Sequence, residues 1–154
     1  MISGPPYPHL DPRVRLIELP SLDLFENGLL SLRPRHLRSL TNILEWTSKL
    51  TGGFAEPYTF GRRAVKYLRE HGHNYDLVHD NQSLSYGVWS MRRLIPTTAT
   101  IHHPITVDRD IAVRAVKPLW KKAKHLRWYS FIGMQKRVAP TLSRIITVSA
   151  CARD

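Results

Sequence analysis

The sequence predicts an α/β fold, a doubly wound and mainly parallel sheet with helices on both faces. Short runs of β-branched residues alternate along the chain with segments whose apolar residues recur at helical spacing. The 154 residues are 42% hydrophobic, which is enough for one domain with its own core. Strands that alternate with helices pair in parallel through right-handed crossovers, and this order yields a doubly wound sheet.

Four short segments are predicted as strands, because each is bounded by turn residues or proline. They span residues 14–19, 76–79, 97–101 and 144–148. The third strand ends abruptly, since Pro104 has no N–H to donate and keeps His103 out of the helical region. Residues 1–12 are rich in proline and are expected to form a loop.

Helical spacing of apolar residues predicts helices between these strands. They are expected over residues 34–50, 59–71, 83–94, part of 104–117, and 118–138. Gly52 and Gly53 should end the first helix, and Thr59 should cap the second. The last is a long basic helix. Ser149 suits the start of a further helix.

Polar side chains follow two of the strands where each strand ends. His102 and His103 follow the strand over 97–101, and His79, Asn81 and Gln82 lie at the end of the strand before it. Ligands of open α/β sheets bind at the carboxyl ends of the strands. Imidazole and amide groups suit sugar hydroxyls, and a protonated imidazole stabilises a phosphate. An ordinary polar turn is the alternative.

Asp108 lies a few residues beyond the two histidines. Its carboxylate could contribute to the same cleft, or it could simply cap a helix.

Positive charge is concentrated in the last third of the chain. The net charge is +11, and residues 111–153 hold ten Lys and Arg without one Asp or Glu. This asymmetry predicts an anionic partner, either phospholipid head groups, nucleotide phosphates or nucleic acid. Basic residues interleaved with tryptophan suit a lipid interface, and the expected interfacial residues are Lys117, Trp120, Lys121, Lys122, Lys124, Arg127 and Trp128. A solvated basic helix face is the alternative.

Several familiar sites are missing from the sequence. It contains no dinucleotide fingerprint, P-loop, zinc-protease motif, nucleophile elbow or C-x-x-C, and no metal site is predicted.

No apolar run approaches the roughly 18 residues that span a bilayer, and the first residues do not resemble a signal peptide. With Cys151 as the single cysteine, a cytoplasmic location is expected, with peripheral binding to the inner face of the plasma membrane as an option.

Three motifs, in this order, carry a family resemblance. They are Asp-Leu-Val-His-Asp-Asn-Gln-Ser-Leu at 76–84, Ala-Thr-Ile-His-His-Pro at 99–104 and Ile-Ile-Thr-Val-Ser at 145–149. Together they resemble the N-terminal, acceptor-side domain of family 4 glycosyltransferases, which have the GT-B fold. The proline-rich opening and the strand over 14–19 are similar to a segment early in that domain. The resemblance covers most of the chain, and residues 1–154 are expected to form one such domain.

The resemblance implies transfer of a hexose from a nucleotide-sugar donor, with retention and without a metal or other cofactor. Two Rossmann-like domains of such enzymes face each other across a cleft, and the N-terminal one holds the acceptor. By motif match, His102 is the catalytic residue beside the donor sugar and phosphates. The residues expected to bind substrate, because of their place at or after the strand ends, are His79, Asn81, Gln82, His103 and Asp108. The acceptor would be a membrane lipid or a cell-envelope glycan. Some members of the family, such as phosphatidylinositol mannosyltransferases, use basic and aromatic patches of this domain to bind membranes, and the basic segment here fits that behaviour.

The sequence also departs from the family pattern. The family's first strand with its glycine-rich loop, and the whole C-terminal donor-binding domain, have no counterpart in these residues. We therefore expect a glycosyltransferase fragment with little activity by itself, from a split, truncated or mis-started gene. The alternatives are a non-enzymatic basic module that binds anionic membranes and an inactive relic. Nucleic-acid binding is the least favoured reading.

Overall fold

The computed structural model describes residues 1–150. In this range the strands are β1 (Ile2–Ser3), β2 (Ile17–Glu18), β3 (Val78–Asn81), β4 (Thr97–Ile101) and β5 (Ile145–Thr147). The α-helices are α1 (Leu40–Leu50), α2 (Glu56–His71), α3 (Tyr86–Met91), α4 (Ile105–Ala115), α5 (Leu119–Trp128) and α6 (Ile132–Val138). Short 3₁₀ turns are η1 (Leu29–Ser31), η2 (Pro34–Arg38), η3 (Gly72–Asn74), η4 (Tyr129–Phe131) and η5 (Ala139–Thr141). The helix predicted after Ser149 falls mainly on residues 151–154, outside the described residues.

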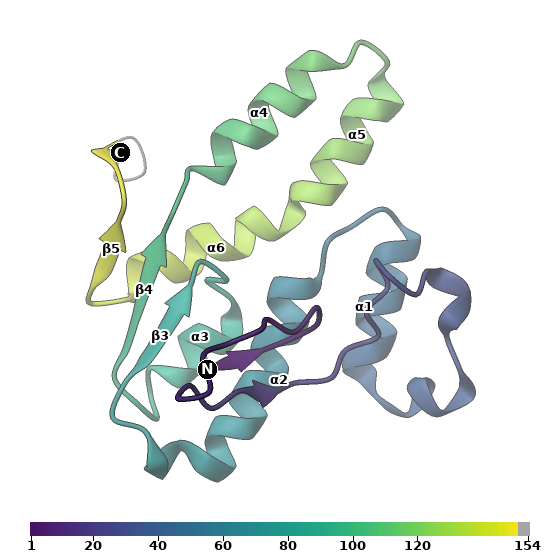
Figure 1. Cartoon of the computed structure of the whole chain (residues 1–154). Helices are drawn as coiled ribbons and strands as arrows, with labels where there is room; N and C mark the ends of the chain where they lie inside the picture. Colours follow the sequence, from purple (N-terminus) through teal and green to yellow (C-terminus); the bar gives the residue numbers. More distant parts are fainter. Residues whose placement is uncertain (151–154) are drawn as a thin grey trace.

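The larger sheet has the strand order β3-β4-β5, and all its strands are parallel (Figure 1). Asn81 pairs with Thr100, and Thr100 pairs with Ile146 across the three strands. The predicted α/β class and the parallel, Rossmann-like sheet are confirmed. The strand predicted over 97–101 has the predicted bounds, and its two neighbours are shifted or shortened by one or two residues.

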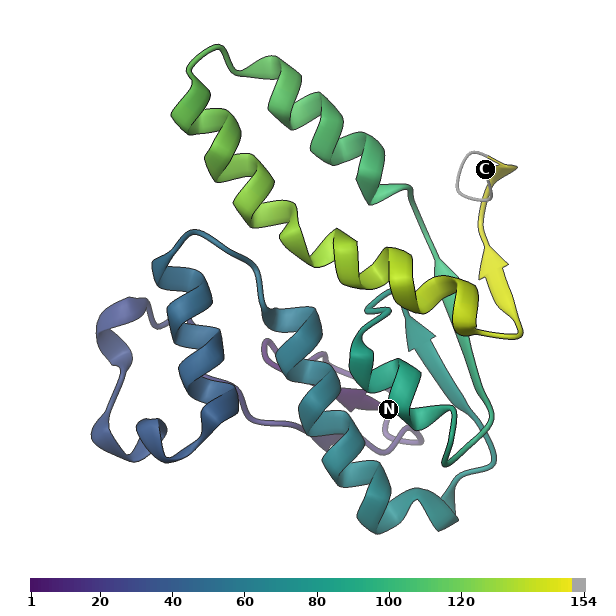
Figure 2. The ribbon, with the colours of Figure 1, turned by 180° about the vertical axis from the view of Figure 1, so that it is seen from behind.

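Helices cover one face of this sheet rather than both. Figure 1 shows the strands in front of α3 and α6, and in Figure 2 these two helices lie in front of the strands. The strand order explains the arrangement, because two successive right-handed crossovers in the same direction put both helices on the same side. In the described residues, no helix lies on the opposite face, where Leu77 and Ile146 are exposed.

A second, two-stranded sheet forms near the N-terminus. Ile2 pairs in parallel with Ile17, and the backbone N–H of Ile17 donates to the carbonyl of Met1 at 2.8 Å. The prediction of a loop over residues 1–12 is therefore wrong at β1, and the strand predicted over 14–19 is reduced to two residues. The ladder is limited to two residue pairs, Ile2 with Ile17 and Ser3 with Glu18.

Local signals explain where the first helices begin and end. The Ser39 hydroxyl accepts from the backbone N–H of Asn42 and caps α1, and a short 3₁₀ turn precedes it. Gly52 follows α1 with a φ of 75°, a conformation that glycine adopts without strain. Helix α2 begins before the predicted cap, because Pro57 suits a first helical turn. Thr59 instead lies buried inside it.

The segment predicted as one long basic helix divides at η4. Helix α5 pairs with α4 as a hairpin that projects from the body, whereas α6 packs against the sheet (Figures 1 and 2). Aromatic contacts hold the division in place. The Trp128 ring stacks on Phe54 with centroids 5.0 Å apart, and Phe131 meets Phe54 edge-on at 5.3 Å. Both residues next to the break are thus pinned to the α1–α2 connection.

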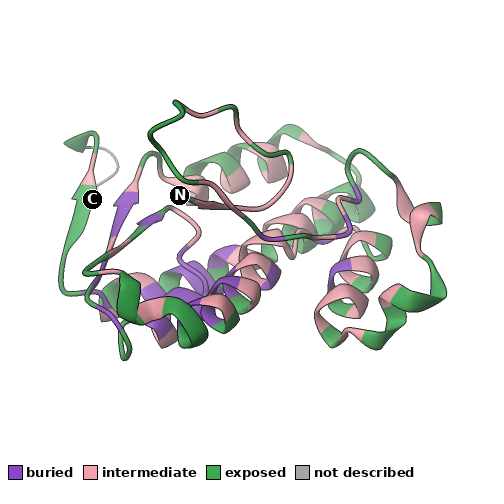
Figure 3. Ribbon diagram, turned by 60° about the horizontal axis from the view of Figure 1, so that its bottom comes forward, coloured by how far each residue is buried: buried purple, intermediate pink, exposed green. Residues whose placement is uncertain are grey.

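The core lies between the helices and the covered face of the sheet, as the purple segments of Figure 3 show. One cluster joins β2 to α2 and α3, and the other joins β4 to α3 and α6. Helices α2 and α3 meet at Gly61 and Gly87. A Cβ atom at Gly87 would collide with the Gly61 backbone, so both positions require glycine for this close approach.

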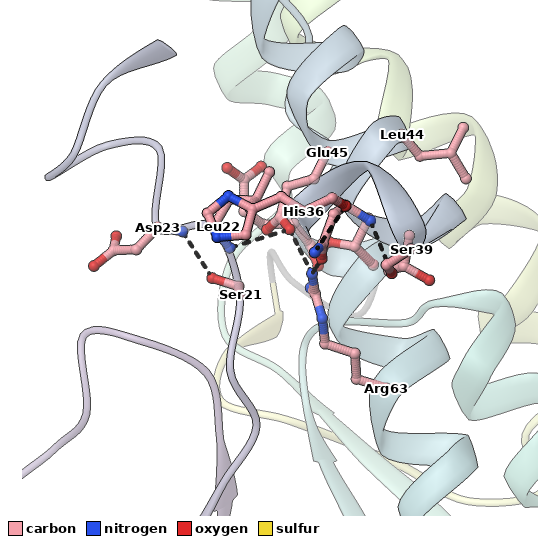
Figure 4. A network of polar contacts seen from close by, with 12 residues as sticks. Ser21, Leu22, Asp23, His36, Ser39, Leu44, Glu45 and Arg63 are labelled. Atoms are coloured by element: carbon pink, nitrogen blue, oxygen red, sulfur yellow. Dashed lines mark hydrogen bonds and ion pairs between the residues drawn. The ribbon is translucent and has the colours of Figure 1, made fainter. Parts of the chain in front are cut away.

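A buried ion pair ties α1 to α2 (Figure 4). The Arg63 guanidinium lies 2.5 Å from the Glu45 carboxylate and also donates to the Asn42 side chain at 2.9 Å. Glu45 accepts in addition from the backbone N–H of Leu22. These contacts satisfy a carboxylate that is 3% exposed, as a buried charge requires.

Candidate functional site

The ends of β3 and β4 bring His102, Asn81 and Gln82 together. The Nε2 atom of His102 lies 2.5 Å from the Asn81 side-chain oxygen. An amide oxygen only accepts, so Nε2 is the donor in this contact. The ring is exposed, and its Nδ1 atom is the ring nitrogen left for a contact with a ligand.

The Gln82 side chain makes two hydrogen bonds to the backbone that follows β4, and we call this pair of hydrogen bonds the Gln82 clamp. Its side-chain oxygen accepts from the backbone N–H of His102 at 2.6 Å, and its amide donates to the carbonyl of His103 at 2.8 Å. These contacts extend the pairing of β3 with β4 beyond the last backbone ladder. Gln82 itself has a φ of 62°, a strained conformation for a residue with a side chain. Its amide is thus committed to the protein rather than turned toward a ligand.

Gln135 on α6 is a site residue that sequence reasoning missed. Its buried amide donates to the carbonyls of Gln82 and Ser83 at 3.0 and 3.3 Å. The signal available in the sequence was helical spacing, because Gln135 follows Met134 and stands three residues before Val138, and both of these residues face the core. Gln135 thus holds the backbone of the strained turn at Gln82 and Ser83. In this way it helps to fix the Gln82 side chain that bonds to the backbone of His102.

Asp80 holds the start of the same turn. Its carboxylate accepts from the Ser83 hydroxyl at 2.5 Å and from the backbone N–H of Leu84 at 2.8 Å. Burial raises the pKa of the Asp80 carboxyl, and these two hydrogen bonds oppose the rise. Side chains alternate along a strand, so Asp80 faces the helices while His79 and Asn81 face the open side.

The other predicted site residues lie nearby but make separate contacts. His103 points to Asp108 in the first turn of α4, with Nε2 3.3 Å from the carboxylate. His79 lies one step back from the strand end, where its Nε2 is 2.9 Å from the Thr100 hydroxyl. The structure therefore gathers Asn81, Gln82 and His102 at one point and leaves His79 on the open face of the sheet.

This arrangement suits polar, hydroxyl-rich ligands. It presents an exposed imidazole and carboxamide at the carboxyl edge of a parallel sheet, where α/β proteins bind ligands. Within residues 1–150, no group of three or more His, Cys, Asp or Glu side chains is placed to hold a metal ion.

The predicted interfacial residues divide into two groups. At the tip of the α4–α5 hairpin, Lys117, Trp120 and Lys121 are exposed, and Leu119 beside them is 82% exposed. Trp120 is 66% exposed, with the Lys121 ammonium 5.5 Å from its ring centroid. Lys124 is exposed further along α5, and Lys122 is half-buried.

Arg127 and Trp128 lie at the other end of α5 and contact the protein. Arg127 donates to the Thr51 hydroxyl at 2.8 Å and to the Ser130 hydroxyl at 3.1 Å. Trp128 belongs to the aromatic cluster with Phe54. Their contacts secure the base of the hairpin, whereas the exposed Lys117, Trp120 and Lys121 at its tip are left for a partner. None of the helices that the structure describes has both the length and the apolar character needed to cross a bilayer.

Comparisons with known proteins identify the family of the chain. The chain is 42% identical over 156 residues to an "MMP alpha-(1->4)-mannosyltransferase" of Mycolicibacterium hassiacum. That alignment covers 99% of this chain and 38% of the relative, so the chain spans less than half of the relative's length. The model of Glycosyltransferase Family 4 matches residues 3–154. The chain therefore belongs to glycosyltransferase family 4.

Proposed function

We propose that this chain forms the acceptor-side half of an enzyme that transfers a hexose from a nucleotide-sugar donor to a glycan or lipid acceptor. The observation that carries the proposal is the meeting of His102 and Asn81 at the carboxyl edge of the sheet in a family 4 chain. In this account the exposed Nδ1 of His102 contacts the transferred sugar, and Asn81 orients the ring.

Mannose is the proposed sugar, because the relative that covers nearly the whole chain is named as a mannosyltransferase. We further propose retention of anomeric configuration and no requirement for a metal, as the family resemblance implies. Donor binding belongs to a second domain, so residues 1–154 alone would bind acceptor without transferring sugar. The clamp formed by Gln82 supports a rigid position for His102, which transfer chemistry needs.

The test uses the complete gene product purified from its own cells and a panel of radiolabelled nucleotide sugars with mannooligosaccharide acceptors. We expect radiolabelled mannose to be incorporated into the acceptor from a mannosyl donor. This incorporation should persist when EDTA removes metal ions. Residues 1–154 alone should bind the acceptor in saturation-transfer NMR without incorporation. If no donor in the panel supports transfer by the complete product, the proposed function is wrong.

A second candidate function is peripheral binding to anionic membranes at the inner face of the plasma membrane. The specific observation in its favour is the exposed Leu119 and Trp120 pair at the hairpin tip, flanked by Lys117 and Lys121. Apolar and aromatic side chains enter the head-group region, while the lysines attract anionic lipid. Such binding would bring an enzyme with a lipid acceptor to the membrane. In a module that transfers no sugar, membrane binding would itself be the function.

Vesicle sedimentation tests the second candidate. The chain should bind vesicles that contain phosphatidylglycerol and release them at high salt. The double variant Leu119→Ser/Trp120→Ser should bind at least tenfold more weakly, because each apolar side chain contributes about 1.5–3 kcal/mol on burial. The control Leu30→Ser removes a completely exposed leucine elsewhere and should change nothing. Equal binding to neutral vesicles would exclude this function.

A further inference from the structure

A basic groove lies on the helical side of the molecule, apart from the His102 site. It has a volume of about 620 Å³ and runs between α2, α3 and the start of α1. Four cations of α2 line it, namely Arg62, Arg63, Lys66 and Arg69, and no acidic residue does. Hydroxyl groups complete the lining, chiefly those of Tyr58, Tyr86, Thr41 and Ser90. We call this surface the α2 groove.

One cation of the α2 groove is neutralised and serves as an anchor. Arg63 pairs with the buried Glu45, which fixes α2 against α1 (Figure 4). The other three cations, Arg62, Lys66 and Arg69, have no ion pair with a carboxylate in the described part of the chain. The groove therefore keeps a net positive charge.

Arg62 is held in place without losing its charge. Its Nε donates to the Thr41 hydroxyl and its Nη1 donates to the Tyr58 hydroxyl, both at 3.3 Å. Outside the groove lining, Arg137 of α6 donates to the hydroxyl of the groove residue Tyr86 at 3.2 Å. Neutral hydroxyls thus orient the guanidinium groups, which leaves their charge available to a ligand.

The spacing of the cations indicates the class of ligand. Arg62, Lys66 and Arg69 recur at intervals of four and three residues, so they share one face of α2 and extend over about 10 Å. Guanidinium groups match phosphate oxygens in geometry and charge, and the neighbouring hydroxyls can donate to the same oxygens. A row of this length exceeds one phosphate group.

We propose that the α2 groove binds a ligand with two or more phosphate groups. Two sources share this chemistry, namely a soluble oligophosphate compound and the head groups of a phospholipid surface. The site is separate from the proposed transfer reaction, and it does not depend on that reaction.

Isothermal titration of the chain with inorganic pyrophosphate tests the proposal. We expect saturable binding that is weaker for orthophosphate. The double variant Lys66→Ala/Arg69→Ala should bind pyrophosphate at least tenfold more weakly. The control Lys136→Ala/Arg144→Ala removes one lysine and one arginine from exposed positions outside the groove, and it should bind like the parent chain. Thermal denaturation verifies that both variants are folded.

Competition then identifies the source of the phosphate. If phosphatidylglycerol vesicles displace bound pyrophosphate, the ligand of the groove is a phospholipid surface. If pyrophosphate stays bound in the presence of the vesicles, the ligand is a soluble compound. The hairpin variant Leu119→Ser/Trp120→Ser keeps the groove intact and should bind pyrophosphate normally. If the groove variant and the control variant lose the same pyrophosphate affinity, the effect is one of net charge and the proposal is overturned. The proposal is also overturned if pyrophosphate binding is not saturable.

Discussion

The side-chain oxygen of Gln82 accepts a hydrogen bond from the backbone N–H of His102 at 2.6 Å. The same amide donates to the carbonyl of His103, so one side chain spans the two residues that follow β4. Position 82 is strained, and Gln135 holds its carbonyl from α6. The location of the His102 ring therefore depends on a residue of the neighbouring strand end.

Replacement of Gln82 tests this dependence. Gln82→Ala should lower the free energy of unfolding by about 0.5–1.5 kcal/mol for each of the two exposed hydrogen bonds that it removes. Urea denaturation measures the loss, and amide hydrogen exchange should accelerate at His102. Gln82→Glu keeps the acceptor and loses the donor, so its effect on exchange at His102 should be smaller. Unchanged exchange in Gln82→Ala would contradict the clamp.

The contact between α2 and α3 predicts opposite effects for two glycines. Gly87→Ala should destabilise the chain by about 1–3 kcal/mol, since the added methyl group collides with the Gly61 backbone. Gly133→Ala in α6 places its methyl group in open space and should stabilise the chain by roughly 0.5–1 kcal/mol. Urea denaturation compares the two. A similar response of both variants would show that α2 and α3 do not approach as described.

Burial of Asp80 predicts a pH dependence of stability. Its pKa is raised above the ordinary 3.8, so the folded state holds the proton more tightly than the unfolded state. This contribution to stability is present below pH 3.8 and is lost as pH rises through the raised pKa. Each unit of pKa difference corresponds to about 1.4 kcal/mol.

Asp80→Asn keeps one oxygen to accept from the Leu84 N–H, turns the contact with the Ser83 hydroxyl into a donation from the amide, and removes this titration. Denaturation curves of the parent chain and the variant should therefore diverge with rising pH in that window, with the parent losing stability relative to the variant. The exposed Asp76→Asn serves as the control. A constant difference between parent and Asp80→Asn across the window would contradict the role of burial.

The open face of the sheet predicts self-association. Ile146 is 53% exposed and Val148 is 59% exposed, and in the described residues the outer edge of β5 pairs with no strand. Apolar edge strands associate with one another. Ile146→Lys should shift the chain toward monomer in sedimentation velocity at high concentration, whereas Leu30→Lys at an exposed site outside the sheets should not. Equal shifts would point to net charge instead.

The sequence predicted that the polar residues after β3 and β4 meet at one edge of the sheet, because its signals there are local. A run of β-branched residues that ends before Pro104 defines β4, and the polar residues after β3 define its neighbour. The parallel sheet then brings Asn81 and His102 to the same edge. Such patterns need no knowledge of distant contacts.

The remaining features depend on contacts between distant parts of the chain. β1 is too short to show any periodicity and exists only because Ile17 pairs with Ile2. Trp128 looked like an interfacial residue, but Phe54 provides a ring for it to stack on. Gln135 reaches the site from a helix much later in the chain. Composition alone also cannot tell that α3 and α6 share one face of the sheet.

The transfer rate of His102→Ala in the complete gene product tests the central claim most directly. The matched control is His73→Ala, which removes an exposed histidine from η3, the turn that precedes β3 at the opposite end of that strand from Asn81. The account predicts that His102→Ala lowers kcat/KM by about 10² or more while the fold is retained, the scale of one lost charge-stabilising contact. His73→Ala should retain the parent rate. Equal rates for His102→Ala and the parent enzyme would contradict the placement of the reaction at this edge of the sheet.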